Sequence, residues 1–256
     1  MKLNIVPPRN GVLWVKLGIR AVLRQPLAMV GLFLMVWFVL FLLAAMPVFG
    51  LVASLVLVPA GALGYMVATG DVAAGNFPLP ARLLAGFREG RERTRALVKL
   101  GVMHAAIVLV ILLVTSWLFP LPQPLPKDDP LAVALSAGHL VAFAIQLPVT
   151  MLFCYAPALS HWHGVPATKA LFFSVVAMWK NLGAFAVFAL AWLAVCALLS
   201  ALLGVAYALL GTSFVVALAL PASLALSAMM LASAYFTFRD SFSADAADDS
   251  EPPPAA

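Results

Sequence analysis

The chain has 256 residues, of which 64% are hydrophobic and only 10% are charged, and its mean hydropathy is +1.07. A soluble domain carries about 25% charged residues, and one core of this size could not hide so much apolar surface from water. The composition therefore excludes a soluble globular protein. The formal net charge of +5 comes from residues beside apolar stretches, which does not indicate nucleic-acid binding.

Residues 1–26 predict a basic helix that lies in the membrane interface. Helical periodicity runs from Asn10 to Gln25. Lys16, Arg20 and Arg24 recur every four residues and share one face, while Trp14 and aliphatic residues cover much of the rest. Such a helix suits the plane of the lipid headgroups.

Six apolar stretches follow, and each is long enough to cross a hydrocarbon core about 30 Å thick. The predicted spans cover about residues 27–46, 48–69, 98–119, 131–159, 182–203 and 214–238, within a membrane domain of residues 27–239. Proline interrupts the second, fourth and sixth spans and predicts kinks in them. We expect an all-α, polytopic helical bundle with six transmembrane helices.

The connections predict two more amphipathic interfacial helices, one in residues 71–97 and the start of span three, the other in residues 160–181. Their basic residues are Arg88, Arg91, Arg95 and Lys99 in the first, and Lys169 and Lys180 in the second. Residues 120–130 are proline-rich and predict a stiff, extended loop. Residues 240–256 form an acidic, proline-rich tail that we expect to be disordered.

The positive charges predict the orientation. Given these spans, fourteen of the fifteen Lys and Arg residues fall on one side of the membrane, and only Lys127 falls on the other. Because positive residues stay in the cytoplasm, both termini and all three basic helices are predicted to be cytoplasmic. Residues 11–70, 82–160 and 165–239 share a pattern of basic segment, span and proline-bearing span, which leaves open a threefold parallel repeat.

Two sets of polar residues are candidate sites. His104, His139 and Gln146 lie in predicted spans, where polar groups are costly and should face other helices or a cavity. They serve either as glue between helices or as part of a solute path. His161 and His163 could share a metal ion in extended structure, or act as interfacial anchors, and we favour the anchors.

Enzymatic motifs are absent from the sequence. It contains no phosphate-binding Gly-rich loop that ends in Lys-Ser/Thr, no His-Glu-x-x-His and no Gly-x-Ser-x-Gly. Acidic residues occur only between spans and in the tail, so paired carboxylates are hard to assemble. We expect a protein that is not an enzyme and has neither catalytic residues nor a cofactor.

Two stretches together resemble a known family. They are Asn4-Ile-Val-Pro-Pro-Arg-Asn-Gly-Val-Leu-Trp-Val-Lys-Leu-Gly-Ile-Arg, continuing to Pro26, and Ala156-Pro-Ala-Leu-Ser-His-Trp-His-Gly-Val, continuing to Trp179-Lys180-Asn181. The chain is similar there to an uncharacterised family of six-span proteobacterial inner-membrane proteins. The resemblance covers most of the chain apart from the proline loop and the tail. It implies a bacterial inner membrane and carries no activity.

We therefore expect the basic helices to bind or organise membrane lipids, chiefly anionic headgroups, or a protein partner, which includes a second copy of the chain. The alternative is a transporter or channel-like protein for a small or apolar solute, with a path between the kinked helices. The proline kinks and the polar residues of span four motivate that alternative.

Overall fold

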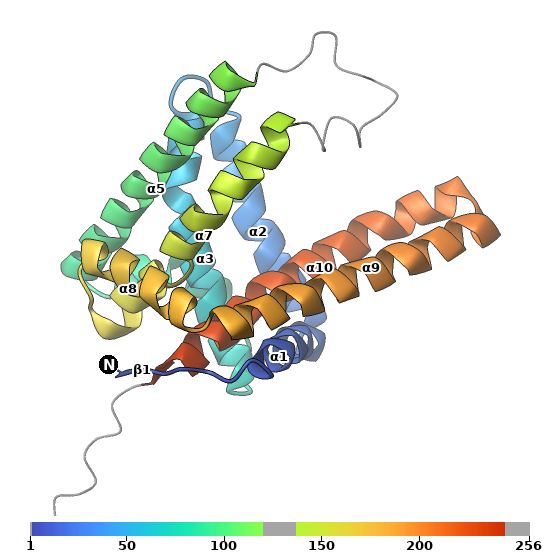
Figure 1. Cartoon of the computed structure of the whole chain (residues 1–256), viewed down its shortest axis with the longest axis horizontal. Coiled ribbons are helices and arrows are strands. Elements are labelled where there is room, and N and C mark those ends of the chain that lie inside the picture. The colour runs from blue at the N-terminus through green and yellow to red at the C-terminus, as the bar shows by residue number, and fades with distance from the viewer. Residues whose placement is uncertain (1, 120–136, 244–256) are drawn as a thin grey trace, which may run out of the picture. The chain divides into compact units, whose positions relative to one another are not determined.

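The computed structural model describes residues 2–119 and 137–243, and it confirms an all-α protein. Two short strands, β1 (Lys2–Leu3) and β2 (Phe242–Ser243), accompany the helices. A 3-10 helix covers Pro80–Leu84. The helices, drawn in Figure 1, are α1 (Asn10–Arg24), α2 (Pro26–Ala44), α3 (Gly50–Ala73), α4 (Ala85–Arg88), α5 (Arg91–Leu118), α7 (Ala137–His163), α8 (Ala167–Lys180), α9 (Leu182–Leu210) and α10 (Thr212–Ser241).

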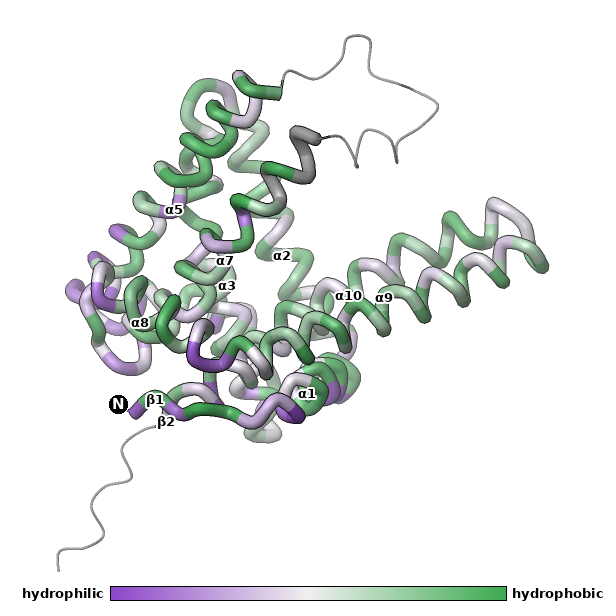
Figure 2. Tube along the Cα trace, viewed as in Figure 1, coloured by the Kyte–Doolittle hydropathy of each residue, from purple (hydrophilic) through white to green (hydrophobic). Residues whose placement is uncertain are grey.

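Five of the described helices, α2, α3, α5, α9 and α10, are long and apolar enough to cross a membrane. Apolar positions follow one another along α9 and α10 in Figure 2. The predicted fourth span falls on α7, and its first residues, 131–136, lie outside the described part of the chain. Lys127, the predicted loop 120–130 and the tail from 244 onward also lie outside it.

The predicted basic helix at 88–99 differs from the structure. Gly90 has φ +103°, a conformation that side-chain-bearing residues rarely adopt, and it separates α4 from α5. Arg88 therefore ends α4, whereas Arg91, Arg95 and Lys99 lie on the first turns of α5. Because α5 continues without a break to Leu118, the basic segment and the third predicted span form one helix.

The chain divides into two compact units, and α2, α3 and α8 contribute to both. The first unit comprises residues 2–35, 64–83 and 176–243 of the described chain. In it α1 packs against α9 and α10, which also contact each other. A β-carbon at Gly11 would lie 2.4 Å from the Ala184 carbonyl oxygen, and one at Gly18 would lie 2.8 Å from the Met229 carbonyl oxygen. The two glycines therefore allow α1 to approach both helices closely.

The two ends of the described chain meet in this unit. Lys2 and Leu3 pair antiparallel with Ser243 and Phe242. The tail that we predicted to be disordered from residue 240 is thus ordered as far as Ser243, because α10 extends to Ser241 and β2 follows it. Both ends lie side by side at one end of α10.

The second unit comprises residues 36–63, 84–119 and 137–175 of the described chain. Its main contact is between α5 and α7. Gly101 lets α5 approach the backbone of α3, since a β-carbon there would lie 2.2 Å from the Val56 carbonyl oxygen. The buried residues of this unit include Leu63, Leu97 and Leu100.

Candidate functional site

The helix α1 has two sharply different faces. Its buried face consists of Gly11, Trp14, Val15, Gly18, Ala21 and Val22. Lys16, Arg20 and Arg24 are all exposed on the opposite face, as their spacing predicts. Leu13 and Leu23 are also exposed beside these cations, at 43% and 61%. The outward face therefore combines positive charge with apolar side chains, as an interfacial helix does.

Trp14 does not belong to that outward face. It is fully buried, its ring centroid lies 5.4 Å from that of Phe185, and its Nε1–H donates a hydrogen bond of 2.8 Å to Asp240 Oδ2. The prediction that Trp14 serves the headgroup plane is wrong. The indole instead fixes α1 to α9 and α10, because a buried indole N–H needs an acceptor and Asp240 supplies one.

The other predicted cations are exposed as well: Arg88, Arg91, Arg95, Lys99, Lys169 and Lys180. On α8 the two lysines accompany exposed aromatic side chains, because Phe172 is 63% and Trp179 is 69% exposed. The opposite side of α8 is buried through Ala170, Ser174 and Ala177. We call the outward cations of α1, of α4 with the start of α5, and of α8 the basic faces.

The ion pairs of the described residues do not involve the basic faces. Among the described residues, the ion pairs join Arg82 to Asp71 at 2.6 Å, Arg239 to Asp240 at 2.9 Å, and Arg93 to Glu89. None of these pairs includes a cation of the basic faces. Across residues 2–119 and 137–243, these nine cations therefore stand outside the ion pairs.

A second group of polar residues surrounds His161 at the end of α7, in the second unit. The His161 side chain is only 4% exposed, and its Nε2 lies 3.3 Å from Glu89 Oε1. Glu89 also pairs with Arg93, so one carboxylate contacts an imidazole and a guanidinium. His161 lies two residues beyond the predicted fourth span. Burial and the charge of Arg93 hold the pKa of the His161 imidazole below its usual value, and the Glu89 carboxylate opposes that shift.

The structure does not provide the geometry that His161 and His163 would need to share a metal ion. That hypothesis needs extended backbone, whereas His161 and His163 both lie in the last turn of α7. Residues two apart on a helix point to different sides, so the two rings cannot share one ion. Within the described residues no group of three or more His, Cys, Asp or Glu side chains is placed to hold a metal.

His104 is engaged between helices. Its Nδ1 lies 2.9 Å from the Leu55 carbonyl oxygen of α3, and its ring lies edge-on to Phe153 of α7 at 5.0 Å. That carbonyl is available because Pro59, four residues later in α3, has no N–H to donate to it. His104 therefore satisfies the backbone group that a proline kink frees, which is what a proline inside a membrane helix requires.

The structure does not bring the other two intramembrane candidates to His104. His139 lies on α7, and its side chain is outside the described part of the molecule. Gln146 is half-buried on the same helix, and its backbone carbonyl accepts a hydrogen bond of 3.0 Å from Thr150 Oγ1. The neighbouring Leu147 is 60% exposed, so this part of α7 faces outward.

Sequence reasoning missed Asn181, which joins α8 to α9. Its Oδ1 accepts a bond of 2.7 Å from the Val6 N–H, and its Nδ2 donates one of 3.1 Å to the Asn4 carbonyl. Asn181 is 1% exposed. The two sequence stretches that carry the family resemblance therefore meet in space. The occurrence of both stretches in the same family was the one signal in the sequence that could have linked residues 4–26 to residues 156–181.

Comparison with known proteins gives one informative relative. A protein of Burkholderia thailandensis, named a probable inner membrane protein, is 35% identical over 261 residues, which cover 94% of this chain and 94% of the relative. No protein-family model and no solved structure matches the chain. The similarity therefore extends over nearly the whole of both proteins.

Proposed function

This chain belongs to the same family as the probable inner membrane protein of Burkholderia thailandensis, and we propose that it is a non-enzymatic protein whose basic faces bind and organise anionic lipid. The chain is a multi-pass membrane protein. One observation carries the proposal: α1 buries its glycines and Trp14 against α9 and α10 and leaves Lys16, Arg20 and Arg24 outside.

Packing gives α1 a fixed outward face. Because Gly11 and Gly18 touch backbone atoms of neighbouring helices, α1 has little freedom to rotate. Its three cations are therefore presented together to one surface. Each Lys or Arg near an anionic membrane surface contributes about 1 kcal/mol, so the three contribute about 3 kcal/mol at low salt.

The exposed aromatic residues of α8 support the same function. Trp and Tyr side chains concentrate at membrane interfaces, and Trp179 is 69% exposed next to Lys180. Lysine side chains reach from such a position to the headgroup phosphates while their methylene stems stay in apolar surroundings. We propose that α1 and α8 both lie at headgroup level.

The basic faces are cytoplasmic in this proposal. Both ends of the described chain lie together, which requires an even number of crossings. The six predicted spans meet that requirement, and the excess of positive residues assigns the side. A fluorescent protein fused after residue 256 should fluoresce in bacteria, whereas a fused alkaline phosphatase should be inactive. The reverse pattern would contradict the orientation.

The lipid proposal is tested by native mass spectrometry of the full chain with added phosphatidylglycerol or phosphatidylcholine. The triple variant Lys16→Gln, Arg20→Gln, Arg24→Gln should lose most of the preference for phosphatidylglycerol. The matched control Lys16→Arg, Arg20→Lys, Arg24→Lys keeps the charge and should keep the preference. Equal retention by wild type and the Gln variant would refute the role of α1.

The transport alternative has less support than lipid binding, because His104 is occupied by the Leu55 carbonyl. The features that still support transport are Gln146 and the prolines inside α3, α7 and α10. Solute flux through proteoliposomes that depends on Gln146 would favour it. The lipid proposal predicts that Gln146→Leu leaves membrane permeability unchanged.

A further inference from the structure

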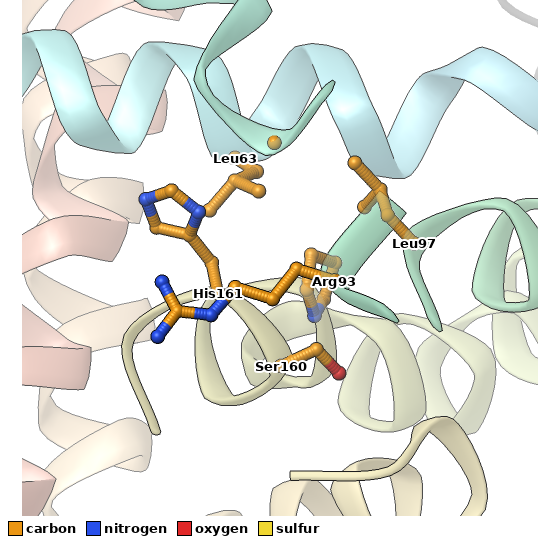
Figure 3. Close-up of a pocket in the computed structure, with 7 residues that line it drawn as sticks. Leu63, Arg93, Leu97, Ser160 and His161 are labelled. Atoms are coloured by element: carbon orange, nitrogen blue, oxygen red, sulfur yellow. The ribbon is translucent and has the colours of Figure 1, made fainter. Parts of the chain in front are cut away.

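A small pocket in the second unit lies between α3, α4, α5 and α7 (Figure 3). Its residues are Leu63, Gly86, Arg93, Leu97, Pro157, Ser160 and His161. In this conformation the space between them is too narrow for a water molecule. The pocket therefore has apolar walls and two strongly polar side chains, Arg93 and His161.

One polar atom in this pocket has no partner. Within the described residues, Nδ1 of His161 is buried and makes no hydrogen bond. The other nitrogen, Nε2, faces the Glu89 carboxylate, which can only accept, so we assign the proton of the neutral ring to Nε2. Nδ1 is then a buried acceptor without a donor. Such a group is costly and indicates a missing partner.

Arg93 lines the same pocket and can supply donors to it. A guanidinium has five N–H groups, and the described structure uses the Nη1 group for Glu89. A ligand for the pocket must therefore carry negative oxygens for Arg93 and, on one of them, a proton for His161 Nδ1. Its remaining part should be compatible with Leu63 and Leu97.

A phosphate monoester has this chemistry. Its second pKa is about 6, so near neutral pH part of the phosphate still carries a proton. That P–OH group can donate a hydrogen bond to Nδ1 of the neutral His161 ring. A phosphodiester has no such proton, so it would require a charged imidazole in a site where burial opposes that charge.

We propose that Arg93 and His161 form a binding site for a phosphate monoester group, held by a lipid such as phosphatidic acid or by a soluble phosphate. The site rests on the proposed function only for its position at headgroup level. It adds selectivity, since the basic faces attract any anion. Entry requires the side chains at the rim to turn outward, and Glu89 and Arg93 are 38% and 40% exposed.

The test uses the full chain in nanodiscs of phosphatidylcholine that contain either phosphatidic acid or phosphatidylglycerol at equal charge. Native mass spectrometry should show wild type retaining phosphatidic acid at least about tenfold more strongly, since a charge-assisted hydrogen bond has that magnitude. His161→Gln should remove the preference and leave phosphatidylglycerol retention unchanged. The matched control His163→Gln should keep both. Glu89→Gln should raise phosphatidic acid retention several-fold, because it removes a competing negative charge.

Competition identifies the source of the monoester. If millimolar inorganic phosphate or glycerol 3-phosphate displaces phosphatidic acid from wild type, a soluble phosphate takes the site; if neither does, the lipid is the ligand. Equal retention of the two lipids by wild type, or an unchanged preference in His161→Gln, would overturn the monoester site. Loss of phosphatidylglycerol retention in the α1 Gln variant reports on the basic faces separately.

Discussion

Replacing Asn181 with Ala should release the N-terminal segment from the body of the first unit. The change deletes the acceptor of the Val6 N–H at 2.7 Å and the donor to the Asn4 carbonyl at 3.1 Å. Val6 is buried, so its amide stays without a partner, which costs about 1–3 kcal/mol. The Asn4 carbonyl is half-buried and water can replace its partner. We expect a loss of about 2 kcal/mol of local stability.

Hydrogen–deuterium exchange of the purified full chain measures this loss. About 2 kcal/mol corresponds to roughly 30-fold more frequent opening, so the amides of Asn4 and Val6 should exchange that much faster, while amides of α9 stay protected. Asn76→Ala, at an exposed position, is the control and should change nothing. Unchanged exchange at Val6 in Asn181→Ala would show that Asn181 does not hold the N-terminal segment in place.

Three further predictions concern packing and pH. His104→Leu should lower the free energy of unfolding in detergent by about 1–3 kcal/mol, because it leaves the Leu55 carbonyl without a hydrogen-bond donor. Gly18→Ala should cost about 1–3 kcal/mol in the same assay, because a β-carbon would lie 2.7 Å from Ser233 Cβ. The folded-state pKa of His161 is lowered, so unfolding should take up a proton, and stability should fall as pH drops below about 6.5. His161→Gln should make the melting temperature less dependent on pH there.

The helices follow from the sequence because hydropathy and helix length are local properties. An uninterrupted apolar run such as residues 27–46 has to satisfy its backbone internally in lipid, which predicts a helix directly, and α2 covers Pro26–Ala44. Helix ends that depend on the backbone conformation of one residue are harder to predict from the sequence. Gly90 interrupts the predicted basic helix after Arg88, and nothing in the periodicity of Arg88 and Arg91 reveals its positive φ.

The burial of Trp14 depends on a contact far away in the sequence. Its acceptor, Asp240, is 226 residues distant, in a segment whose composition favoured disorder. The composition of the helix therefore led to the prediction that Trp14 lies in the headgroup plane. Gly11 and Gly18 lie on the same face as Trp14, and small residues at that spacing indicate close helix packing, so the pattern did contain a usable signal.

Among the candidate sites, too, local features could be predicted from the sequence, whereas contacts between distant segments could not. The exposure of Lys16, Arg20 and Arg24 follows from their shared helical face, which is a local property. The pairing of His161 with Glu89 depends on how α7 meets the α4–α5 junction, and a single sequence does not encode that in any local pattern. The sequence does predict that the Leu55 carbonyl needs a donor from elsewhere, because Pro59, four residues later, has no N–H to offer it. It does not predict that His104 is that donor.

If the basic faces gather anionic lipid, the lipid shell around the full chain should be enriched in it. The protein should be extracted from bacterial membranes with a polymer that keeps its surrounding lipid, and phosphatidylglycerol in that shell should be compared with the bulk membrane. We predict severalfold enrichment in wild type and a bulk-like shell when Lys16, Arg20 and Arg24 are replaced with Gln together with Arg88, Arg91 and Arg95. A wild-type shell with the bulk composition would show that the basic faces do not gather anionic lipid.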